Sequence, residues 1–201
     1  MLNRLHGEIR LVAMALLVLA GCAGNAAPPQ AGEPAVRPPS LISRRVMVLP
    51  VQEVVGVPGN LDAELTFALS GRGDEVLWIF PDAVREALAR SPSMRVPLDA
   101  LPVSMFLNTE VRRVGDPLYG MLRRAAALMD AEVAMIPVQV GARPSTLEKE
   151  GGIEIRVALI HIVTGDVLWY GVEQGTPGDG RDPSALASAM EAMARRLVPG
   201  T

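Results

Sequence analysis

Residues 153–163, IEIRVALIHIV, and residues 167–174, VLWYGVEQ, are separated only by Thr164-Gly165-Asp166. Along the first segment, apolar side chains alternate with polar ones, so that one face holds Ile153, Ile155, Val157 and Leu159 and the other holds Glu154 and Arg156. Alternation of this kind on both sides of a short turn with glycine predicts a β-hairpin. We expect Trp169 to lie in the core beside it.

Other apolar runs predict further strands. Residues 44–52 read RRVMVLPVQ and residues 133–140 read VAMIPVQV. Continuous apolar runs are typical of inner strands that are covered on both faces. We also expect a strand in VLWIF at 76–80, and a short strand or sheet edge in MRVPL at 94–98. Residues 61–69, LDAELTFAL, fit a short helix and a strand equally well.

Helix start signals occur at three places. Asp82 precedes AVREALAR as a capping residue, and Asp116-Pro117 and Asp182-Pro183 each place a proline directly after a cap. Apolar residues follow at helical spacing, and the buried stripe of the last helix is expected to be Leu186, Met190, Met193 and Leu197. The order of elements mixes a hairpin with crossover connections. The predicted fold class is therefore α+β, a mixed β-sheet with helices packed on it in a single domain.

The amino terminus has the pattern of an export signal. Arg4 and Arg10 accompany an apolar run at residues 11–20, which is too short to span a membrane but suits the apolar region of a signal peptide. The run ends in Leu19-Ala20-Gly21-Cys22, which resembles the lipobox of bacterial lipoproteins. The resemblance implies a signal peptide at 1–21 and lipidation of Cys22. Because Ala23 follows the cysteine, it also implies an outer-membrane lipid anchor that faces the periplasm.

The composition changes after the cysteine. Residues 22–43 are rich in proline and alanine and hold few large apolar side chains, so we expect a flexible tether there. The folded domain is expected at 44–198.

Composition excludes several classes of function. The net charge of −3 argues against a nucleic-acid partner, and aromatic residues make up only 3% of the chain. With two His and one Cys in the whole chain, we expect no disulfide framework, no metal site and no cofactor.

No catalytic constellation is visible in the sequence. His161 continues the apolar face of its strand, and we expect it to be structural. Ser70 lacks the first glycine of a nucleophile elbow, and the sole lysine, Lys149, lies in a charged loop. Paired carboxylates such as Asp62/Glu64 are expected on solvated loops. We therefore predict that the protein is not an enzyme.

Three side chains are candidates for partner binding. Trp78 is either a core residue or an exposed anchor, because tryptophan is enriched at the energetic centres of interfaces. Arg112 and Arg113 form one of four arginine pairs, which indicate either a solvated face or a docking patch.

Two segments resemble the amino-terminal domain of TolB and its relatives, the CsgG fold and the LpoB-type activators. These segments are Val48-Leu49-Pro50-Val51 and the stretch from Leu159 to Trp169. The resemblance implies a non-catalytic, protein-binding adaptor or assembly factor in the cell envelope, and it leaves homo-oligomerisation open. The alternative is a subunit of a CsgG-like secretion oligomer in the outer membrane, which would need amphipathic, membrane-crossing strands within residues 52–80, with residues 66–80 as half of a hairpin.

Overall fold

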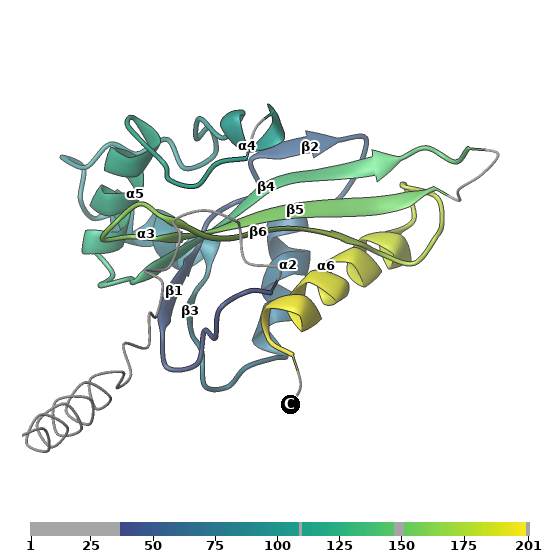
Figure 1. The fold of residues 1–201 in the computed structure, drawn as a ribbon, viewed down its shortest axis with the longest axis horizontal. Coiled ribbons are helices and arrows are strands. Elements are labelled where there is room, and N and C mark those ends of the chain that lie inside the picture. Colours follow the sequence, from purple (N-terminus) through teal and green to yellow (C-terminus); the bar gives the residue numbers. More distant parts are fainter. Residues whose placement is uncertain (1–36, 109, 147–150, 200–201) are drawn as a thin grey trace, which may run out of the picture. The chain divides into compact units, whose positions relative to one another are not determined.

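A computed structural model describes residues 37–108, 110–146 and 151–199, and these form a mixed sheet with helices on both faces (Figure 1). Within those ranges the strands are β1 (Arg45–Val48), β2 (Glu53–Val55), β3 (Leu77–Ile79), β4 (Val133–Arg143), β5 (Gly152–His161) and β6 (Val167–Gln174). The helices are α2 (Leu61–Ser70), α3 (Pro81–Ala89), α4 (Met105–Asn108), α5 (Leu118–Ala127) and α6 (Pro183–Leu197). The predicted α+β fold class is confirmed.

The strand order is β3-β1-β4-β5-β6, and β2 also pairs with β4. The strands β1 and β2 run parallel to β4, one beside its first residues and the other beside its last. The predicted hairpin is present, since β5 pairs antiparallel with both β4 and β6. The sheet therefore ends in β3 on one side and in β6 on the other.

The two faces of the sheet bury separate apolar clusters. One cluster joins the sheet to α2 and α6 and includes Val46, Leu65, Leu159, Trp169 and Met190. The other lies on the face with α3, α4 and α5 and includes Met47, Leu122, Ile136 and Ile160. Figure 1 shows α2 beside α6 on one side of the sheet, with α4 and α5 on the opposite side. Trp169 is 2% exposed, as the sequence predicted.

The last helix begins as its sequence predicts. Asp182 is the N-cap of α6 and accepts a hydrogen bond from the Ser184 N–H at 2.8 Å. The first residues of two other helices differ by one or two positions from the predicted ones. The helix α3 begins at Pro81, so Asp82 lies inside its first turn and Phe80 precedes it. The helix α5 begins at Leu118, and the Asp116 carboxylate accepts a hydrogen bond from the Gly120 N–H.

The structure corrects one expectation about strands and decides one open alternative. Residues 94–98 form no strand: Pro97 lacks an N–H, and the segment is held by the Gln52 side chain, whose Nε2 donates to the Leu98 carbonyl at 2.8 Å. Residues 61–70 are helical, with Leu61, Leu65 and Leu69 buried on one side. The structure does not support residues 66–80 as half of a membrane-crossing hairpin, because residues 66–70 belong to α2.

The ends of the described chain lie close together. Leu41, which the sequence analysis assigned to the tether, is 2% exposed and belongs to the core. The Ser43 N–H donates to the Glu75 carbonyl at 2.8 Å. Residues 38–42, 73–76 and 197–199 line one hollow of about 550 Å³.

Candidate partner-binding surface

Trp78 makes several contacts within the domain. It lies in β3, where its indole Nε1 donates to the Arg72 carbonyl at 3.3 Å. Its ring stacks against Phe80 with centroids 6.4 Å apart, and it packs on the cluster beneath α2 and α6. The side chain is half-buried, so only part of the ring is available to a partner.

Arg112 and Arg113 lie beside the hairpin turn. The Arg112 carbonyl accepts the Val167 N–H at 2.8 Å. The Arg113 Nε donates to the Thr164 carbonyl at 2.8 Å and lies 3.7 Å from an Asp166 carboxylate oxygen. Both side chains are exposed. Because the hairpin and β3 lie at opposite edges of the sheet, the structure does not bring Trp78 and these arginines into one site.

His161 stabilises the same turn. Its Nδ1 lies 3.1 Å from the Thr164 hydroxyl, and the ring is half-buried at the end of β5. In the ranges that the structure describes, no group of three or more His, Cys, Asp or Glu side chains is placed to hold a metal ion.

No helix among the described residues is long and apolar enough to cross a membrane. The lipobox residues Leu19, Ala20, Gly21 and Cys22 lie outside the described residues, so their predicted role stays a prediction.

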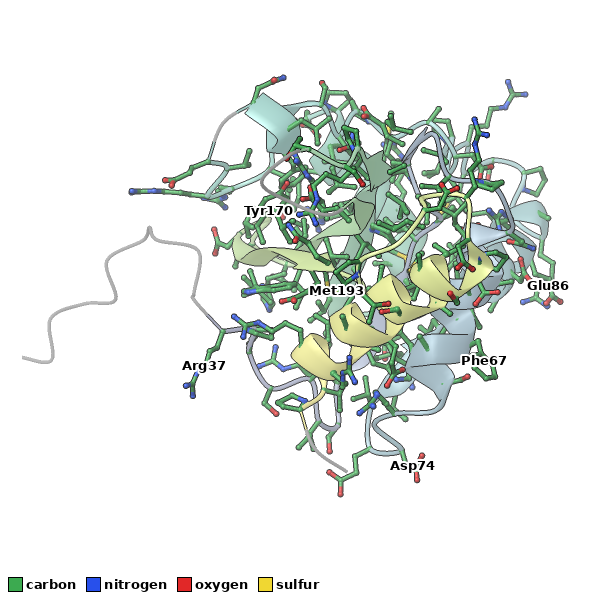
Figure 2. All side chains as sticks on the ribbon, turned by 90° about the vertical axis from the view of Figure 1, so that its right-hand side faces the viewer. Arg37, Phe67, Asp74, Glu86, Tyr170 and Met193 are labelled. Atoms are coloured by element: carbon green, nitrogen blue, oxygen red, sulfur yellow. The ribbon has the colours of Figure 1, made fainter. Side chains whose placement is uncertain are left out.

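Phe67 is the most exposed large apolar side chain of the described residues. It is 78% exposed on α2, and Figure 2 shows it on the outer side of that helix. The buried stripe of α2 is Leu61, Leu65, Ala68 and Leu69, which leaves Phe67 on the opposite side. Burying a phenylalanine contributes about 1.5–3 kcal/mol. An interface that buries Phe67 would gain a free energy of this size, which the isolated domain does not gain because the ring is exposed.

Two hollows meet at Phe67. The first, of about 580 Å³, lies between α2 and α3 and includes Asp62, Thr66, Asp82 and Arg85. The second, of about 400 Å³, lies between α2 and α6 and includes Glu64, Ala187 and Glu191. Phe67 lines both hollows, so an apolar ring stands between two concave regions that are large enough for partner side chains.

The surface around Phe67 is acidic. Arg85 donates to Asp62 at 2.7 Å, to Asp99 at 2.9 Å and to Asp82 at 3.1 Å. Three carboxylates around one guanidinium leave a net charge of −2 in this group. The hydrogen bonds that Arg85 donates to Asp62 and Asp99 raise the pKa of its guanidinium above the ordinary value.

On the other side of Phe67, the Arg72 Nε donates to Glu191 at 2.9 Å, and Glu64 adds a further acidic side chain. This side of Phe67 therefore holds two carboxylates, Glu64 and Glu191, and only Glu191 is paired with the Arg72 guanidinium. A partner side chain that is basic or apolar therefore fits this surface better than an acidic one.

Sequence reasoning missed Phe67 because residues 61–69 fit a helix and a strand equally well. Once the segment is helical, the period of 3.6 residues separates Phe67 from the Leu61, Leu65 and Leu69 stripe. The missing signal was therefore the secondary structure of α2 rather than the residue itself.

No protein-family model matches the chain, and no curated protein matches it by sequence. Solved structures give distant matches. The chain resembles the LpoB C-terminal domain from Salmonella enterica, with 16% identity, a TM-score of 0.41 and coverage of 65% of this chain and 81% of that one. It also resembles a PelC dodecamer subunit from Paraburkholderia phytofirmans, with 15% identity, a TM-score of 0.40 and coverage of 82% and 94%.

A lipoprotein from Neisseria meningitidis matches with 16% identity and a TM-score of 0.36 over 64% of this chain and 77% of that one. Likeness at these levels assigns neither a family nor a function to the present chain.

Proposed function

We propose that this protein is a lipid-anchored envelope lipoprotein whose folded domain binds another envelope protein and performs no catalysis. Cys22, the only cysteine of the chain, follows Leu19-Ala20-Gly21, as a lipidation signal requires. A tether that begins at Cys22 would hold the domain on the periplasmic side of the outer membrane.

The main observation in support of protein binding is the exposure of Phe67. An aromatic ring that is 78% exposed and bordered by two hollows has the shape of an interface anchor. The acidic groups around it indicate a partner surface that combines an apolar side chain with Lys or Arg.

Site-specific photo-crosslinking in intact cells tests this role. A photoreactive phenylalanine analogue at position 67 is expected to capture one partner in a fixed ratio. Phe67→Ala is expected to abolish co-purification of that partner, while the melting temperature stays close to that of the wild type because the side chain is exposed.

Val163→Ala is the matched control, since Val163 is 72% exposed at the hairpin end of the molecule. Co-purification of the partner that survives Phe67→Ala and is lost with Val163→Ala would contradict the assignment of the surface. A ladder of self-cross-links without a second protein would instead support an oligomer of this chain. Cys22→Ala tests the anchor separately, because the protein should then leave the membrane fraction.

A further inference from the structure

The outer edge of β6 presents backbone hydrogen-bonding groups. The Gly175 N–H donates to the Ile153 carbonyl at 3.0 Å. In an antiparallel ladder, residues alternate between groups that point to the neighbouring strand and groups that point away. From the β5–β6 register, the backbone groups of Gly171 and Glu173 therefore face β5, and those of Tyr170, Val172 and Gln174 face outward.

Among the residues that the structure describes, another segment pairs with only the first part of this edge. The Arg112 carbonyl accepts the Val167 N–H, and Arg113 forms an isolated bridge with Asp166. Within the described residues, no backbone hydrogen bond joins the outward groups of Tyr170, Val172 and Gln174 to another segment. The side chain of Val172 is 43% exposed.

Residues 170–174 of this edge lack the usual protection of a free strand, since the register shift of β6 lies before them, between Val167 and Trp169. Exposed edges are commonly very short or carry proline or lysine. The opposite edge strand, β3, has three residues, whereas β6 has eight and contains neither proline nor lysine. The charged Glu173 belongs to the other face of the sheet, where its carboxylate lies 3.5 Å from Arg196 Nε.

A hollow of about 370 Å³ opens beside the same edge. Its walls come from β5, from β6 and from the segment around α4, and they include Phe106, Val111, Tyr170 and Val172. The rings of Phe106 and Tyr170 are stacked, with centroids 6.1 Å apart and planes 8° apart. The charged residues that line it, Glu110 and Arg156, have opposite signs, so the hollow favours an uncharged apolar side chain.

We propose that residues 170–174 of β6 bind an extended segment of a partner protein, which adds a strand to the sheet and places an apolar side chain in this hollow. Backbone hydrogen bonds supply affinity in such complexes, and pockets for alternate side chains supply specificity. Five residues of strand are about 17 Å long. An edge of this length is small beside the ~800 Å² per partner of a standard interface, so a peptide segment fits it better than a second copy of the chain. The β6 edge is distinct from the Phe67 surface.

The test uses a display library of random octapeptides that is panned on the full chain. Enriched peptides are expected to alternate apolar and polar residues and to slow amide hydrogen exchange in β6. Val172→Pro removes an outward N–H while leaving the β5–β6 hydrogen bonds in place, and it should weaken binding at least about tenfold. Val172→Thr keeps the N–H and the branched side chain, and its affinity should stay within about twofold of the wild type.

Three results would overturn the proposal: failure to enrich any peptide, equal binding by Val172→Pro, or a peptide-free dimer that Val172→Pro dissociates in sedimentation. Melting temperatures close to the wild type would show that both variants are folded. Phe67→Ala should leave peptide binding unchanged, so that failure at the β6 edge is distinguished from failure of the Phe67 surface.

Discussion

Gly171→Ala should destabilise the domain because the Trp169 ring occupies the space of the added methyl group. An alanine Cβ at position 171 would lie 1.9 Å from Cζ2 of Trp169 and 2.1 Å from its Cη2. Trp169 is 2% exposed, so its ring can move only by displacing core neighbours. Overpacking of this kind costs about 1–3 kcal/mol. For a domain of this size, each kcal/mol lowers the melting temperature by about 2–4 °C. We expect a fall of about 2–12 °C.

Thermal unfolding followed by near-ultraviolet circular dichroism measures both effects of this substitution. The melting temperature should fall, and the tryptophan bands should change because the Trp169 ring is displaced. Gly115→Ala is the matched control, since nothing lies within 4 Å of an added Cβ there. An unchanged melting temperature together with unchanged tryptophan bands in Gly171→Ala would refute the packing described for Trp169.

Three further predictions concern other parts of the domain. Asp182→Ala should lower the free energy of unfolding by about 1 kcal/mol in urea titrations, because α6 loses the side chain that accepts the Ser184 N–H. Asp182→Asn should retain most of this stability, since an asparagine side chain can also accept that hydrogen bond. Leu65→Ala should cost about 2–5 kcal/mol in the same assay, since Leu65 is fully buried, and a loss below 1 kcal/mol would contradict its place in the core. Burial raises the pKa of Tyr170 above its ordinary value of about 10, so folding stability should be lost as the pH rises from about 10 through the folded-state pKa. Tyr170→Phe should lessen this alkaline loss between pH 9 and 12, and identical pH profiles would disprove the linkage.

Sequence reasoning succeeded where the signal is local. The alternation of Ile153, Ile155 and Val157 against Glu154 identifies the hairpin, because a strand has a side-chain period of two residues. The Asp182-Pro183 start of α6 is equally local, since a cap acts within its own first turn.

Elements that depend on distant contacts were harder to predict. The segment at 94–98 is held by Gln52, whose side chain also accepts the Leu101 N–H at 2.8 Å. The helical state of residues 61–70 is fixed by packing of Leu65 and Leu69 in the cluster shared with α6. The contact of Gln52 has no sequence pattern. The helix α2 does have local signals, the Asn60 cap on the Ala63 N–H and the spacing of its buried leucines, and these place Phe67 on the exposed side.

Residues 38–42 and 197–199 line the same hollow, so the polypeptide enters and leaves the domain at one corner. Neighbouring ends make the domain a suitable subject for circular permutation. A short glycine-rich connection would join these ends, and new termini would fit the exposed turn at residues 91–94. The strand order would then be kept while the ends of the chain moved to another corner. Such a permuted chain would separate the role of the fold from the role of the place where the chain enters it.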